Sequence, residues 1–230
     1  RKIKQLLEWV DVYKQNKQLK ETIDCYEECL KYINFNLEEK MDYSSHRGAV
    51  HHAHNDFKNA IEDYSKSLVI SKELCLKEDT ASLLGHLGCA YQDRGNEGDL
   101  DLAIDLYKET VSTDILHGTI TIGRANNLSN LGNAYKLKGD ETGDKKYYDS
   151  AKSCHEEALA MNIELKATEG QAANCANIGL ICEMIGEIDE ATTKYQDAKT
   201  LFGQSERADI VQAIINDLPT QQVSSSKKEK

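Results

Sequence analysis

Proline is almost absent from this sequence, since Pro219 is the only one among 230 residues. Aromatic residues are also few, at 7%, and the single tryptophan is Trp9. No run of 18 apolar residues occurs, so the sequence predicts no membrane-spanning helix. Alternating β-branched runs are scarce, whereas Ala, Leu, Glu, Lys and Asp are abundant. These absences argue against a sheet protein and favour an all-α protein.

Positive charge is also in short supply. The chain carries 28 Lys and Arg against 39 Asp and Glu, a formal net charge of −11. Nucleic-acid binding requires clustered Lys and Arg to neutralise phosphates, so this balance argues against a nucleic-acid partner. The sequence begins at Arg1, without a methionine or a signal-like apolar core. We therefore expect the chain to be a processed form or a piece of a longer protein.

Cysteine is present in an odd number, seven. Most of the cysteines fall among apolar positions of predicted helices and not in loops. We interpret them as small buried residues of a protein in a reducing compartment, the cytoplasm. The seven are Cys25, Cys29, Cys75, Cys89, Cys154, Cys175 and Cys182.

A glycine recurs in the middle of predicted helices, although glycine there costs about 1 kcal/mol relative to alanine. In "LSNLGNAYKLKGD", residues 128–140, Gly132 follows a leucine and precedes a tyrosine by three positions. The same arrangement recurs at intervals of about 40 residues, which predicts stacked repeats. The glycines are Gly48, Gly88, Gly132 and Gly179, and Val10 takes this position in a weaker first copy.

A second pattern follows each of these positions. It consists of an alanine, then an aromatic or polar residue four positions later, then a small residue three positions after that. The copies are Ala60/Tyr64/Ser67, Ala103/Tyr107/Thr110, Ala151/His155/Ala158 and Ala191/Tyr195/Ala198, with a weaker Thr22/Tyr26/Cys29.

The order Leu-Gly-x-x-Tyr, Gly, Ala-x-x-x-Tyr-x-x-Ala resembles the tetratricopeptide repeat (TPR), a helix–turn–helix of 34 residues, over about 200 residues of this chain. The chain departs from the family pattern in two ways: its repeats are longer, and the proline at the end of the second helix is missing. It is most similar to the elongated-repeat subgroup, which includes spindle-orientation adaptors and kinesin light chains.

The resemblance implies a right-handed superhelical solenoid of about five repeats. We expect a TPR array over 1–204, a capping helix at 205–218 and a disordered tail at 219–230. The expected repeats are 3–36, 41–74, 81–117, 125–165 and 172–203.

Close helix packing would explain the glycines. We expect each one to lie against the alanine of the second helix, with the aromatic residues filling the next layer, because small contact residues let helices approach closely. The longer segments 95–102 and 139–150 are predicted to be solvated loops or extended first turns. Their Asp and Gly residues lack the spacing of a calcium loop.

No catalytic or metal-binding constellation is recognisable. His51, His52 and His54 form "HHAH", but nothing at zinc spacing completes a ligand set, so we interpret them as ordinary helix-surface histidines. Cys25 and Cys29 coincide with helix-packing positions. We therefore expect no enzyme activity, no cofactor and no metal.

Polar residues occupy a column two positions before the glycine position in each first helix, which the resemblance places on the concave face. Amide side chains both donate and accept hydrogen bonds, so such a column suits the backbone of a peptide or helix from a partner. Alternatively, the asparagines bond to neighbouring repeats. The candidate groove residues are His46, His86, Asn126, Asn127, Asn130, Asn133, Lys136, Asn174 and Asn177.

Two functions from different classes fit this sequence. The first is a protein–protein interaction scaffold or adaptor that holds a partner in its groove. The second is a regulatory or sensor arm of a larger enzyme or ATPase. A structural subunit of a large assembly is not separated from the first by the sequence. A carboxylate clamp of the kind found in chaperone adaptors is disfavoured, because Lys136 is the only well-placed cation near the asparagines.

Overall fold

The computed structural model describes residues 2–33, 36–117, 120–203 and 212, and in these residues the chain forms ten α-helices and no β-strand. The helices are α1 (Lys2–Gln15), α2 (Leu19–Tyr32), α3 (Leu37–Ala53), α4 (Phe57–Glu73), α5 (Lys77–Arg94), α6 (Asp99–His117), α7 (Ile122–Thr142), α8 (Lys145–Glu164), α9 (Thr168–Met184) and α10 (Ile188–Phe202). None of the described helices is long and apolar enough to cross a membrane. The expected all-α helical-repeat fold is confirmed.

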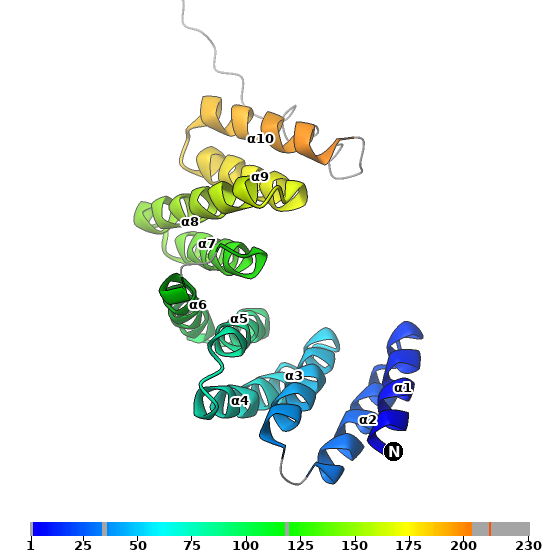
Figure 1. Ribbon diagram of the computed structural model, residues 1–230. Helices are drawn as coiled ribbons and strands as arrows, with labels where there is room; N and C mark the ends of the chain where they lie inside the picture. Colours follow the sequence, from blue (N-terminus) through cyan, green and yellow to red (C-terminus); the bar gives the residue numbers. More distant parts are fainter. Residues whose placement is uncertain (1, 34–35, 118–119, 204–211, 213–230) are drawn as a thin grey trace, which may run out of the picture. The chain divides into compact units, whose positions relative to one another are not determined.

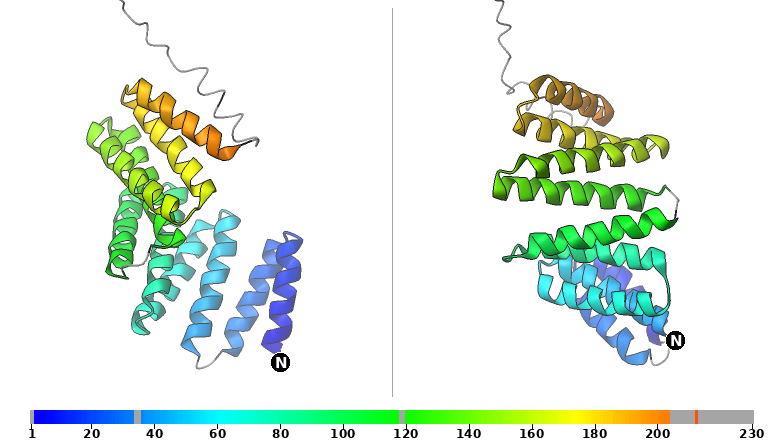
Figure 2. Two further views of the ribbon diagram at one scale, coloured as in Figure 1. Left: turned by 45° about the horizontal axis from the view of Figure 1, so that its top comes forward. Right: turned by 90° about the vertical axis from the view of Figure 1, so that its left-hand side faces the viewer.

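The chain divides into two compact units, Arg1–Thr119 and Ile120–Lys230. The first unit contains α1 to α6 and the second α7 to α10. Within each unit, every helix packs against the next one along the chain, as Figures 1 and 2 show. Odd-numbered helices also touch, since α3 contacts α5 in the first unit and α7 contacts α9 in the second. Each unit is therefore a stack of helix pairs in which the odd-numbered helices form one layer.

Short polar side chains and left-handed turn residues mark the helix ends. Asn36, Asp56 and Thr121 act as N-caps, because their side chains accept a hydrogen bond from a backbone N–H of the first turn. Gly95 and Gly143 follow α5 and α7 with φ values of 65° and 69°, which glycine adopts at little cost. Local sequence thus defines where several of the helices start and stop.

The repeated glycines face aromatic rings of the second helix. A Cβ at Gly132 would lie 2.8 Å from Cδ2 of His155, and one at Gly179 would lie 2.8 Å from Cδ1 of Tyr195. Gly88 meets Tyr107 and Gly48 meets Tyr64 in the same way. The expectation that alanines form the nearest contact was therefore wrong. The ring on the second helix fills the space beside each glycine, because a ring is larger than the methyl group of an alanine.

The rings also carry hydrogen bonds. The hydroxyls of Tyr107 and Tyr195 donate to Cys89 and Glu183, which lie on the other helix of the same pair. In the first pair, Val10 stands where the other pairs have glycine, and it is itself buried beside Tyr26 in one apolar cluster. The pair of α1 and α2 thus has the aromatic ring, Tyr26, but no glycine facing it.

The two longer segments do not form projecting loops. α7 continues through Gly139 to Thr142. Gly139 is buried, and a Cβ at this position would lie 2.8 Å from Cε1 of Tyr148. At 95–102, α6 already begins at Asp99, whose buried carboxylate accepts two hydrogen bonds from Arg94 at 2.8 and 2.7 Å. The extra residues mostly lengthen helices. The expected capping helix at 205–218 and the expected tail at 219–230 lie outside the described residues, with the exception of Gln212.

The ring contact predicts that Gly132→Ala destabilises the protein. The new methyl group would collide with His155, which is buried and hydrogen-bonded, so we expect a loss of about 1–3 kcal/mol in the free energy of unfolding. Gly123→Ala is the matched control in the same helix, because its Cβ would meet nothing closer than 3.7 Å. Urea unfolding should show a loss for the first variant and no loss for the second. Equal stability of the two variants would contradict the ring contact.

The cysteines give a second prediction. None of the seven forms a disulfide, and Cys75 alone among them is exposed. Burial raises the pKa of the thiols elsewhere, for example of Cys154 to about 11, which keeps them protonated and slow to react. Brief treatment of the native protein with iodoacetamide should therefore modify one thiol, and peptide mass spectrometry should place it at Cys75. Cys75→Ser serves as the control and should leave no rapidly modified thiol; rapid alkylation of the other six would contradict the packing.

Candidate functional site

In the first unit, His46 and His86 lie on α3 and α5, and each packs its ring on a tyrosine. The His46 ring stacks on Tyr26, with centroids 6.0 Å apart and an interplanar angle of 15°. The His86 ring lies tilted on Tyr64 at 5.2 Å. Both histidines nevertheless keep an exposed part. We call His46 and His86 together the histidine face.

The electrostatic surroundings keep the histidine face uncharged. Burial, followed by the charge of Lys14, lowers the pKa of His46, although Asp42 opposes this shift. Burial also lowers the pKa of His86, and His52 and His46 act in the same direction. An ordinary histidine has a pKa near 6.5, so both rings are neutral at pH 7 and offer one donor and one acceptor nitrogen each.

In the second unit, amide side chains occupy one side of α7 and α9. Nδ2 of Asn177 donates to Oδ1 of Asn133 across the two helices, at 3.4 Å. Asn130 lies one turn before Asn133 on the same side of α7 and is half-buried, while Asn126 is exposed. We call Asn126, Asn130, Asn133 and Asn177 the amide face. The hydrogen bond between Asn133 and Asn177 joins α7 to α9.

Three of the predicted residues of this unit, Asn127, Asn130 and Lys136, interact with other residues of the chain. Asn127 and Asn130 both interact with other residues of the protein. Lys136 forms an ion pair with Asp140 at 2.7 Å, one turn further along α7. That pair is partly exposed and within one helix, so it stabilises little and leaves the Lys136 ammonium accessible.

Asn174 differs from the other asparagines because it is buried. Its Oδ1 accepts from Ser129 at 2.9 Å and lies 3.0 Å from Nδ1 of His155, while its Nδ2 donates to the carbonyl of Gly170. This amide links α7, α8 and α9 and is 2% exposed. Asn174 therefore holds these helices together inside the protein, and its side chain is not accessible to a partner.

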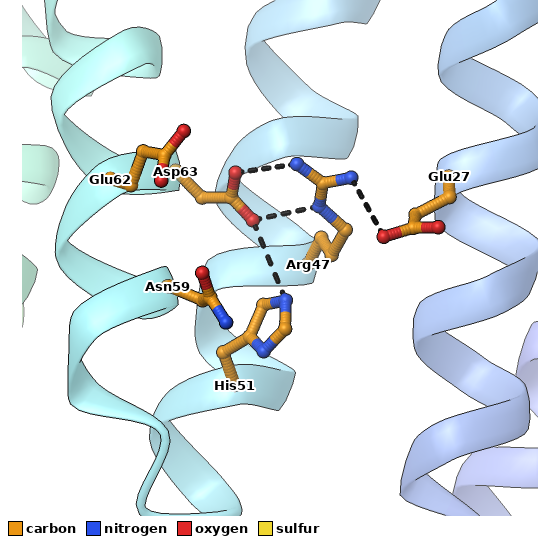
Figure 3. A pocket seen from close by; sticks show the side chains of 6 residues that line it. All are labelled: Glu27, Arg47, His51, Asn59, Glu62 and Asp63. Carbon is orange, nitrogen blue, oxygen red and sulfur yellow. Dashed lines mark hydrogen bonds and ion pairs between the residues drawn. The ribbon is translucent and has the colours of Figure 1, made fainter.

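A polar cavity of about 230 Å³ lies among α2, α3 and α4 of the first unit (Figure 3). At its centre Arg47 donates two hydrogen bonds to Asp63, at 2.7 and 2.6 Å. His51 lies beside them, with Nδ1 3.1 Å from Asp56 and Nε2 4.0 Å from Asp63. His51 is buried, so its interpretation as a surface histidine was wrong.

The charges of this cavity largely satisfy one another. Arg47 also approaches Glu27 on α2 at 3.6 Å, and Asn59 donates to Asp56 at 2.7 Å. Removing one member of such a buried pair leaves an uncompensated charge and destabilises the fold. The cluster therefore stabilises the packing of three helices. This cluster was not predictable from the sequence, because its members come from three separate segments.

One group of metal-type ligands occurs in the part of the chain that the structure describes. It consists of Cys182, Glu187 and Glu190 in the second unit. The ammonium of Lys152 already lies 2.9 and 2.8 Å from the two carboxylates. A protein cation thus holds the position that a metal ion would take.

Comparison with known proteins identifies the fold. No protein-family model matches the chain, and no curated protein matches it. Among solved structures, BtubC (BKLC) from P. vanneervenii is 20% identical with a TM-score of 0.72, covering 99% of this chain and 87% of that one. The TPR-like repeats of a putative kinesin light chain from Podosopora anserina are 16% identical with a TM-score of 0.69, covering 89% and 97%. The chain has a TPR-type helical-repeat fold.

Two further TPR-type neighbours are Rap proteins. The apo form of RapI is 13% identical with a TM-score of 0.79, covering 94% of this chain and 75% of that one. A Rap protein complexed with competence and sporulation factor is 16% identical with a TM-score of 0.68, covering 90% and 55%. At these identities the likeness concerns the fold alone.

The histidine face predicts a pH dependence of stability. Because the folded pKa values of His46 and His86 are lowered, the unfolded chain binds protons that the folded chain does not, and stability falls as the pH drops below about 6.5. The double variant His46→Gln/His86→Gln should lose less stability between pH 7 and pH 5.5 than the wild type. The control is His54→Gln, at an exposed position of the α3 end. Urea unfolding at several pH values measures this; an equal slope in the wild type and the double variant would contradict the lowered pKa values of the two rings.

Proposed function

We propose that this chain is a non-enzymatic protein–protein interaction scaffold, which binds a peptide or helix of a partner protein along its odd-numbered helices. We also propose that it acts in a reducing compartment, the cytoplasm, because none of its seven cysteines forms a disulfide. The partner is a protein and not a nucleic acid, since the net charge of −11 would repel phosphates.

The amide face carries this proposal. The bond between Asn133 and Asn177, at 3.4 Å, is longer than an ordinary N–H···O bond, so little free energy is lost when a partner backbone replaces it. Each amide has spare donor or acceptor positions after making one bond. Regularly spaced amides of this kind pair with a peptide backbone of any sequence, as a scaffold requires.

The histidine face adds a second contact type. Neutral His46 and His86 rings provide flat surfaces and one hydrogen-bond donor each, without the cost of burying a charge. Such rings suit apolar or aromatic side chains of a partner. The two faces belong to different units, and each is proposed as a contact surface in its own right.

The fold neighbours support the general kind of function. One neighbour, which this chain matches over 55% of its length, is a Rap protein solved in complex with competence and sporulation factor. Fold likeness alone is a weak guide to function, so the proposal depends on the amide face.

The proposal is tested with peptides selected from a random phage-displayed library on the wild-type chain. Fluorescence anisotropy then gives the affinity of the enriched peptides for the wild type and for Asn130→Ala/Asn177→Ala. Each lost amide contact is worth about 0.5–1.5 kcal/mol, so the double variant should bind roughly tenfold more weakly or worse. Ser153→Ala/Gln196→Ala, on exposed positions of α8 and α10, is the control and should bind like the wild type.

Melting temperatures of the same variants separate binding from stability. A groove role predicts weaker binding with an intact fold. If the double variant melts earlier but binds normally below its melting temperature, the asparagines only join repeats and the groove proposal fails.

A further inference from the structure

A second cavity, of about 210 Å³, lies between α1 and α2 at the start of the first unit. Its lining combines aromatic and acidic side chains: Trp9 and Tyr13 are one turn apart on α1, and Glu21 and Asp24 are one turn apart on α2. Leu6 and Cys25, both 7% exposed, form an apolar floor. Burial, with a further contribution from Asp24, raises the pKa of the Cys25 thiol, so this floor is uncharged.

The polar and exposed groups at the cavity rim make few interactions with the rest of the described residues. Trp9 is 47% exposed, which is unusual for the largest apolar side chain. Among the described residues, none donates a hydrogen bond to the carboxylates of Glu21 and Asp24, and none forms an ion pair with them. The neighbouring Lys14 is engaged elsewhere, because its ammonium donates to the hydroxyl of Tyr26 at 2.9 Å.

We propose that this cavity binds an arginine side chain presented by a partner protein. The aliphatic stem would lie on the floor of Leu6 and Cys25, and the guanidinium would stack on Trp9 or Tyr13. A guanidinium over an aromatic face is attracted by the negative potential of the ring. The carboxylates of Glu21 and Asp24 would accept its N–H groups, which suit planar, forked pairing.

Other classes of ligand fit this cavity less well. An anion would be repelled by Glu21 and Asp24. A purely apolar side chain would take water from the two carboxylates without replacing their hydrogen bonds. Within the described residues, Glu21 and Asp24 do not belong to a group of ligands close enough together to hold a metal ion. A cationic side chain with a flat head satisfies both the rings and the carboxylates.

The test uses the single tryptophan of the chain as a reporter. With 5-fluorotryptophan incorporated, the full chain should show one ¹⁹F resonance, which reports on this cavity. Titration with Nα-acetylargininamide should shift this resonance in a saturable manner. The matched citrulline compound, which has nearly the same shape but no charge, should give no saturable shift. Absence of a saturable shift with the arginine compound would overturn the proposal, as would an equal shift with citrulline.

Two variants test the carboxylates. Glu21→Gln/Asp24→Asn should weaken binding roughly tenfold, because it removes the charge of the acceptors and keeps their shape. Glu73→Gln/Asp79→Asn removes the same charge at exposed positions that do not line the cavity, and should leave the affinity unchanged. Equal weakening in both variants would mean that only the net charge attracts the probe and would overturn the site. A lysine compound that binds as tightly as the arginine compound would overturn the assignment to arginine. None of these variants changes the amide face, so the outcome of this test is independent of the proposed function.

Discussion

The contact of a flat ring with a glycine is the constraint on which each of the later helix pairs depends. Tyr64, Tyr107, His155 and Tyr195 all lie where a Cβ on the facing glycine would come within about 3 Å. The ring fixes how the two helices of a pair meet, and the glycine makes room for it. The cost of glycine in a helix, about 1 kcal/mol, is offset by the packing that the ring provides.

The repeat pattern made the fold predictable, because glycine, alanine and tyrosine recur in a fixed order along the chain. The identity of the contact was not predictable in the same way. The sequence shows that Gly132 and Ala151 are both small, which suggested that they touch, but only the three-dimensional register shows that His155 reaches the glycine first. Likewise, Gly139 looked like the start of a loop, and its burial against Tyr148 depends on a residue nine positions later.

The candidate groove residues were chosen from their order in the sequence, and their contacts were not predictable from it. The column of polar residues includes His46 and His86, but only the structure shows that each packs on a tyrosine ring. That Asn177 bonds to Asn133 of another helix was left open as one of two alternatives. Asn174 could not be distinguished from its neighbours, because its burial depends on Ser129 and His155 from other helices. The cavity with Trp9 was missed for a similar reason, since its two sides come from separate helices and each looks ordinary alone.

The imidazole of His155 has a consequence for exchanging repeats between proteins of this fold. Tyr107 and Tyr195 place their hydroxyl bonds inside their own helix pair, so these two bonds are kept when the pair is moved as a unit. His155 instead bonds Asn174 of the following pair, which makes α7 to α10 a matched set. A chimera that cuts between α8 and α9 would separate the histidine from its amide, whereas a graft of all four helices would preserve the junction.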